Sequence, residues 1–148
     1  MTPEQRHRIL ALTPLERLTR CWQTLGITTP YRCVRGPETG MVMVRGRMGG
    51  SGRAFNLGEM TLTRASVVLD EPAASSPEVG HGWVKGRSHA HAELMALIDA
   101  CARTPHWAPR IEAELIEPLT QALTDARDER SRYAAATRVD FFTMVRGE

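Results

Sequence analysis

The segment from Arg45 to Arg53 has the composition of an anion-binding loop. It is rich in glycine and arginine, and the residues that could contact an anion are Arg45, Arg47, Gly49, Gly50, Gly52 and Arg53. Glycines let successive backbone amides point at one anion, while guanidinium groups add charge and bidentate donors. The segment matches neither the P-loop nor the dinucleotide-binding fingerprint. It indicates either a loop that binds phosphate or carboxylate, or a plain hairpin turn with solvated arginines.

Three potential metal ligands, His89, His91 and Glu93, stand at alternate positions. The segment is predicted to be helical, and residues two apart on a helix point about 200° away from each other. The three side chains therefore cannot converge on one ion, and no metal site is predicted. His91 lies at the edge of the apolar stripe and is expected to be partly buried, whereas His89 points outward. His91 and Glu93 stay candidate site residues, with a simple hydrogen bond from His91 to a carbonyl or carboxylate as the alternative.

Arg87 follows Gly86 at a predicted junction between a strand and a helix N-terminus. Backbone amides at such a position favour anions, so Arg87 is a candidate for phosphate or for an acidic residue of a partner protein. No serine, threonine or cysteine shows a base partner at short spacing. No catalytic nucleophile is therefore assigned.

Helices are predicted at the start and in the second half of the chain. The first should run from Pro3 to about Leu12, and the second from Pro14 to Leu25, capped by Thr13 in a capping box and ended by Gly26. Ser88 should cap a helix that reaches about Arg103. A last helix should run from about Arg110 to Ala136, with an interruption or kink at Pro118.

Strands are predicted between these helices, where β-branched and apolar residues fall in short runs broken by glycine. The expected strands are 31–35, 40–47, 53–57 and 61–69, forming an antiparallel meander, then 81–85 and a final strand from about Thr137. Residues 71–79 are read as a loop or tolerant insertion. This pattern predicts one α+β domain over residues 1–148, with a mixed or mostly antiparallel sheet, helices before and after it, and a C-terminal strand.

The C-terminal strand is expected to be apolar on both faces. Alternation places Val139, Phe141 and Val145 on one face, predicted to join the subunit's own core. The opposite face is expected to meet the chain's own helices or a partner protein, and its candidate interface residues are Arg138, Asp140, Phe142 and Arg146.

Composition narrows the class of protein. The 148 residues carry a net charge of only +2, which does not favour nucleic-acid binding, and Lys85 is the sole lysine among 19 basic residues. No apolar run approaches the roughly 20 residues that cross a bilayer, so no membrane association is expected. Three widely spaced cysteines and no secretory segment favour the cytoplasm.

Three stretches resemble the PhnG family, a small subunit of the bacterial carbon-phosphorus lyase system. They are Arg47-Met48-Gly49-Gly50-x-Gly52, then Trp83-Val84-x-Gly86-Arg87-x-x-x-His91-Ala92-Glu93 with the later Ala96-Leu97-Ile98-Asp99-Ala100, and the tail Arg138 to Glu148. They occur in the family's order over roughly two-thirds of the chain, which makes chance agreement improbable.

The resemblance implies a core complex with PhnH, PhnI and PhnJ, two copies of each, assisted by the ATPase-like PhnL. The implied reaction is displacement of adenine from ATP by methylphosphonate, which gives α-D-ribose 1-methylphosphonate 5-triphosphate. The resemblance places nucleosidase activity in PhnI and radical cleavage in PhnJ, so this chain is expected to be required but non-catalytic. ATP would be a substrate of the assembled complex, with no cofactor bound by this chain alone. Two alternatives are a free-standing binder of phosphorylated small molecules and a purely structural adaptor.

Overall fold

A computed structural model describes residues 1–70 and 78–137 of the chain. The chain begins with two helices, α1 (Pro3–Leu12) and α2 (Leu15–Leu25). Gly26 ends α2 in the left-handed conformation, with φ 62°, as predicted. The predicted capping box at Thr13 is wrong, because the Thr13 hydroxyl donates to the Ile9 carbonyl at the end of α1. A capping box instead begins α1, where Thr2 and Gln5 bond reciprocally.

The sheet is one long hairpin plus a short strand. Strands β1 (Tyr31–Arg47) and β2 (Ala54–Leu69) pair antiparallel, and β3 (Val79–Lys85) pairs with β2 in the order β1-β2-β3. The prediction of four short strands in this region is wrong. Gly36 and Pro37 do not end a strand but lie within the register shift between Arg35 and Glu38, inside the continuous strand β1.

The helices of the second half confirm most of the predicted pattern. Ser88 caps α3 (His89–Cys101) by accepting a hydrogen bond from the His91 amide. Helix α4 (Ala108–Ile111) leads into a π-helical turn, η2 (Glu112–Ile116), and then into α5 (Glu117–Ala136). The irregular turn lies just before Pro118, which lacks an amide hydrogen and crowds the carbonyl four residues back. The predicted interruption near this proline is thus confirmed.

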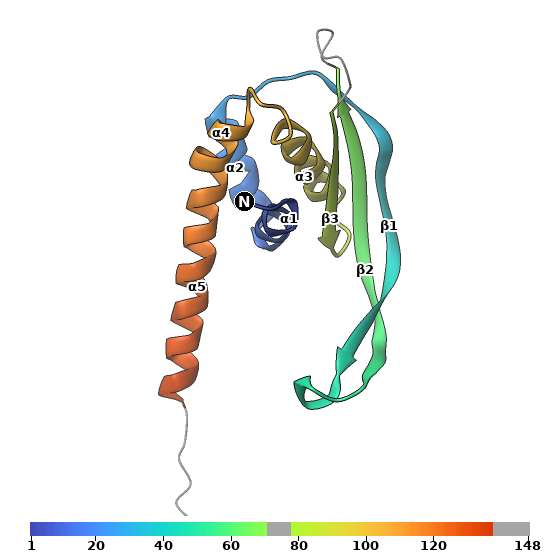
Figure 1. The fold of residues 1–148 in the computed structure, drawn as a ribbon, viewed down its shortest axis with the longest axis vertical. Coiled ribbons are helices and arrows are strands. Elements are labelled where there is room, and N and C mark those ends of the chain that lie inside the picture. The colour runs from blue at the N-terminus through green and yellow to red at the C-terminus, as the bar shows by residue number, and fades with distance from the viewer. Residues whose placement is uncertain (71–77, 138–148) are drawn as a thin grey trace, which may run out of the picture.

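The core lies between the sheet and the helices. Helix α3 packs directly on β2 and β3, and α1, α2 and the α4–α5 segment lie farther out on the same side, while β1 forms the opposite margin of the sheet (Figure 1). Buried residues of β2, including Ala65, Val67 and Leu69, meet Met95, Ile98 and other residues of α3 in one cluster. The architecture is a single α+β fold with an antiparallel sheet, as predicted.

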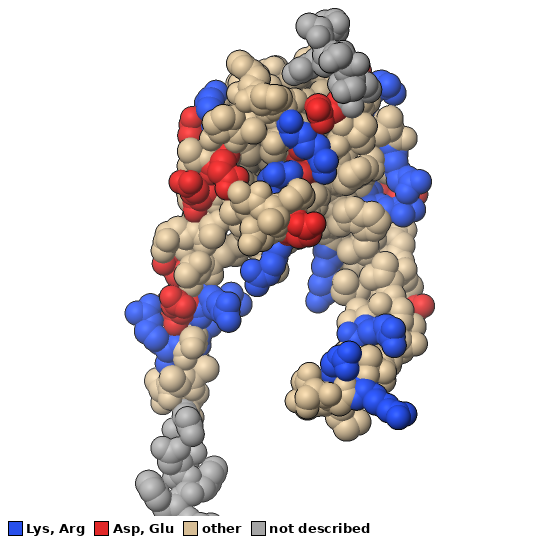
Figure 2. All heavy atoms as spheres, in the orientation of Figure 1, with Lys and Arg blue, Asp and Glu red and all other residues tan. Residues whose placement is uncertain are grey.

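Part of the hairpin extends past this core. β3 ends opposite Leu62, so the paired segments 41–47 and 54–61 and the turn between them, here called the distal arm, continue alone (Figure 1). The turn contains a short 3-10 helix, η1 (Met48–Gly50). The distal arm and α5 project from the core in the same direction and leave a hollow between them (Figure 2). The predicted final strand falls mainly on residues 138–148, outside the described residues.

Candidate functional site

The predicted anion-binding loop forms the tip of the distal arm. Gly49 and Gly50 have φ angles of 61° and 81°, a conformation that glycine adopts without steric cost. The turn closes through a bond from the Gly52 amide to the Met48 carbonyl, and Arg47 Nη1 donates to the Gly52 carbonyl at 3.1 Å. One of the three arginines therefore bonds the loop itself. Arg45 and Arg53 are exposed and available for contacts outside the chain.

Apolar side chains accompany these arginines along the arm. Met43, Met48, Phe55 and Leu57 have exposed fractions of 50%, 75%, 43% and 62%. The chain carries no acidic residue between positions 45 and 58, and basic side chains mark this end of the molecule (Figure 2). Exposed apolar groups mixed with arginine are typical of protein interfaces, whereas a solvated hairpin would need few of them. The distal arm thus has the composition of a docking surface.

Arg87 lies away from the arm's tip, at the junction of β3 and α3. Its side chain is exposed, and the preceding Gly86, with φ 95°, is fixed by bonds to Thr61 and Thr63 of β2. The first amides of α3 are partly satisfied by Ser88. The structure therefore does not bring Arg87 and the glycine loop into one pocket.

His91 and Glu93 both contact other elements of the same chain. His91 is buried and its Nε2 donates to the Leu10 carbonyl at 3.0 Å, which ties α3 to the end of α1. Glu93 accepts a hydrogen bond of 2.9 Å from the Tyr31 hydroxyl at the start of β1. Burial, together with this bond to a carboxylate, raises the pKa of Tyr31 to about 12. His89 is exposed, as predicted, and His91, which was predicted to be partly buried, is buried. The hydrogen-bond partners of His91 and Glu93 lie on α1 and β1.

Asp99 was quoted in the family resemblance but was not predicted as a site residue. Its carboxylate is fully buried, with Arg6 Nη2 at 2.6 Å from Oδ1 and Arg103 Nη2 at 3.0 Å from Oδ2. The His81 amide also donates to Oδ2. Burial alone would raise the pKa of Asp99, but the bonds from Arg6 and the His81 amide and the nearby charges lower it below its usual value. The carboxylate links α1, α3 and β3.

Asp99 had one local signal that sequence reasoning missed. An acidic residue stands beside Met95 and Ala96 in a largely apolar predicted helix, four positions before Arg103. Arg6 could not have been found in the same way, because it is 93 positions away and the ion pair depends on how α1 packs on α3.

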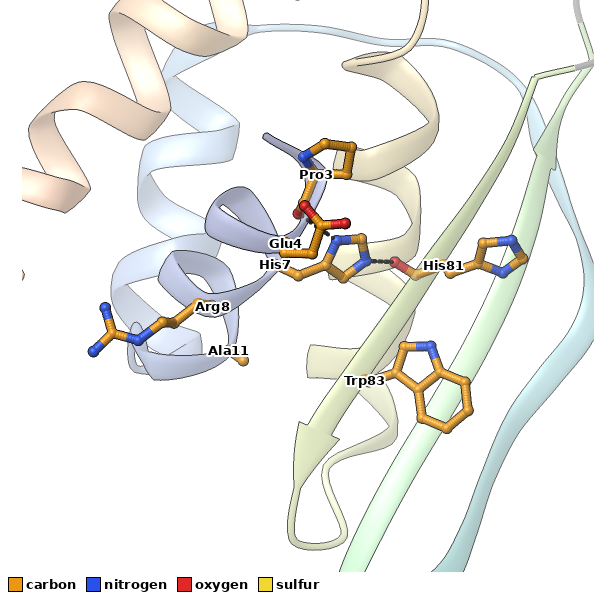
Figure 3. A pocket seen from close by; sticks show the side chains of 7 residues that line it. All are labelled: Pro3, Glu4, His7, Arg8, Ala11, His81 and Trp83. Atoms are coloured by element: carbon orange, nitrogen blue, oxygen red, sulfur yellow. Dashed lines mark hydrogen bonds between the residues drawn. The ribbon is translucent and has the colours of Figure 1, made fainter. Parts of the chain in front are cut away.

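A groove of about 670 Å³ opens between α1 and β3 (Figure 3). His7 closes one end, where its Nε2 donates to the His81 carbonyl at 2.7 Å. Trp83 lines the other end and lies exposed beside Arg64, with the guanidinium carbon 5.6 Å from the ring centroid. The lining residues are Pro3, Glu4, His7, Arg8, Ala11, His81 and Trp83. No residue of α1 was among the predicted site residues.

Other predictions concern metals, membranes and the tail. Within residues 1–70 and 78–137, no group of three histidine, cysteine or acidic side chains is placed to hold a metal ion. No helix in the same ranges combines the length and apolar character needed to cross a membrane. The predicted interface residues of the tail, Arg138, Asp140, Phe142 and Arg146, lie outside the described residues.

Comparison with known proteins places the chain in a family. A family model described as "Phosphonate metabolism protein PhnG" matches residues 2–147. A protein of Rhizobium meliloti (strain 1021), named alpha-D-ribose 1-methylphosphonate 5-triphosphate synthase subunit PhnG, is 46% identical over 142 residues, which cover 95% of this chain and 86% of that protein. Both matches extend over nearly the whole sequence, and they confirm the predicted resemblance. The chain belongs to the PhnG family.

Proposed function

We propose that this chain is a required, non-catalytic subunit of α-D-ribose 1-methylphosphonate 5-triphosphate synthase. The observation that carries the proposal is the 46% identity, along nearly the whole chain, to a protein named as that subunit. The assembled enzyme would displace adenine from ATP with methylphosphonate. The engagement of His91 and Glu93 with Leu10 and Tyr31 supports a structural role for these two side chains.

The proposed partners are PhnH, PhnI and PhnJ in a core complex with two copies of each subunit, together with PhnL, in the cytoplasm. ATP binds to the assembled complex, and this chain supplies contacts that hold or shape that assembly. The distal arm supports this role because it exposes arginine and apolar side chains with no covering element among the described residues.

Co-expression tests the proposal. The tagged chain is produced with the candidate partner subunits, and pulldown should recover them as one complex. The complex should release adenine from ATP in the presence of methylphosphonate and PhnL, whereas the complex lacking this chain should not. The chain alone should release no adenine. Adenine release by the isolated chain at a catalytic rate would contradict the non-catalytic role, and tight nucleotide binding by the isolated chain would favour a free-standing binder.

The arginines of the distal arm provide a more specific prediction. The double change Arg45→Ala and Arg47→Ala should leave the stability of the isolated chain within about 1 kcal/mol, because exposed charges contribute little to folding. Complex recovery or adenine release should nevertheless fall, because partner carboxylates or phosphate groups would lose the Arg45 guanidinium and the loop would lose the bond from Arg47 to Gly52.

The matched control is Arg17→Ala with Arg20→Ala, two exposed arginines of α2. This pair removes the same charge from a different surface and should leave assembly and turnover unchanged. Equal behaviour of both double variants would show that the arm's arginines are ordinary solvated side chains.

A further inference from the structure

β3 is an edge strand, and its backbone groups alternate between bonding β2 and facing outward. The Gly86 amide bonds the Thr61 carbonyl, and the Leu69 amide bonds the Glu78 carbonyl, so even-numbered residues of this stretch bond β2. The amides and carbonyls of the odd-numbered residues point away from the sheet. An outward edge of this kind can pair with another strand unless something covers it.

At His81 the edge is already covered by side chains of the same chain. The His81 amide donates to Asp99 at 3.1 Å, and the His81 carbonyl accepts from His7 at 2.7 Å. A side chain of α3 thus bonds the outward amide of His81, and a side chain of α1 bonds its outward carbonyl. The bonds fix α1 against the edge at His81, and no further strand can pair there.

Two positions farther along, the edge is open. The outward amides and carbonyls of Trp83 and Lys85 bond no described residue. Beside Trp83, the groove is bordered on the α1 side by Ala11, whereas the Arg8 side chain points away from β3 (Figure 3). The space is therefore bounded by unpaired backbone groups of β3 on one side and by α1 on the other.

We propose that this groove receives an extended segment of a partner subunit, which pairs with Trp83 and Lys85 as a fourth strand. An extended backbone presents donors and acceptors at the same two-residue spacing as the outward groups of Trp83 and Lys85, and single segments bind many sheet edges in this way. A second copy of this chain fits less well, because its own β3 edge would be closed at His81 by the same bonds from His7 and Asp99. The partner identity rests on the proposed function.

The groove also specifies the side chains of that segment. One face should carry an apolar residue that packs against Ala11.

A proline at Lys85 tests the pairing. Proline removes the outward amide hydrogen and is tolerated on an edge strand where that amide faces solvent. Lys85→Pro should leave the melting temperature of the isolated chain close to that of the original chain and weaken recovery of the partner complex roughly tenfold, the effect of about 1.4 kcal/mol. Lys85→Ala removes the same side chain, keeps the amide, and should recover the complex normally. Equal recovery with both variants overturns the inference.

Amide hydrogen exchange supplies a readout that needs no variant. In the isolated chain the Trp83 and Lys85 amides should exchange rapidly, and in the assembled complex they should be protected at least tenfold. The Val84 amide, which faces β2, should be protected in both states and serves as the internal control.

The other outcomes are distinguishable. Slow exchange at Trp83 and Lys85 in the isolated monomer would show that the chain covers its own edge, and protection that rises with concentration alongside a dimer would assign the groove to a second copy. Either result overturns the inference. Failure of the original chain to recover any partner would instead contradict the proposed function. Recovery with both amides still exchanging rapidly would overturn only the docking site.

Discussion

The substitution Gly82→Ala should destabilise the fold by about 3 kcal/mol or more. A Cβ at this position would collide with the Ala92 carbonyl oxygen and come within 2.8 Å of the Ala96 amide nitrogen. These are backbone atoms of α3, so a side-chain rotation cannot relieve the clash, and the helix would have to move off the sheet. We expect a melting temperature lower by roughly 10 °C for a domain of this size. Thermal unfolding followed by circular dichroism measures it.

Gly40→Ala is the matched control. Gly40 also lies in a strand, its φ is not positive, and a Cβ there would meet no atom within 4 Å. Its replacement should change stability by less than about 1 kcal/mol, because only the intrinsic preference of glycine is altered. If Gly82→Ala lowered the melting temperature no more than Gly40→Ala does, that result would contradict the close approach of α3 to β3 at Gly82.

The need for glycine at position 82 shows what sequence reasoning could and could not supply. Local signals predicted α3 from Ser88 and the end of α2 from Gly26, because each depends on a few neighbouring residues. The requirement at Gly82 depends on how closely a helix approaches a strand. That distance is a property of tertiary packing, and no local pattern encodes it.

The long hairpin was missed for a related physical reason. Glycine weakens a strand, so a reading based on propensity divides β1 near Gly36 and Gly40. In the structure the pairing with β2 carries the strand through both positions: Gly36 lies within a register shift, and Gly40 pairs in regular register with Leu62. The glycine loop was correctly predicted to lie between strands. Its projection beyond β3 was not predicted, because it depends on β3 being much shorter than β1 and β2.

The candidate site was predictable only in part. His91 was predicted to be buried because the helical period fixes the face on which it lies. Its acceptor, the Leu10 carbonyl, comes from a helix 81 positions earlier, and the groove beside β3 likewise requires α1. The roles of Arg45, Arg53 and Arg87 stay predictions, because these residues are exposed and their proposed partners lie outside the chain.

The substitution Asp99→Asn should lower the free energy of unfolding by about 3 kcal/mol at neutral pH. It keeps the size of the side chain but leaves buried Arg6 without an opposite charge, and breaking a buried ion pair is costly for this reason. Urea denaturation at pH 7 measures the loss. Glu114→Gln is the control, since it makes the same chemical change in an exposed pair with Arg110 and should cost less than about 1 kcal/mol.

The pH dependence separates this ion pair from a simple packing effect. The pKa of Asp99 is lowered on folding, so the unfolded chain binds a proton more readily than the folded protein does. The stabilisation is therefore fully present above the unfolded pKa of about 4 and is lost as the pH falls through the lower folded value. The stability difference between the original chain and Asp99→Asn should accordingly shrink as the pH is lowered from 7 toward 3. A difference that stays constant over this range would mean that the shape of the side chain, rather than its charge, holds α1, α3 and β3 together.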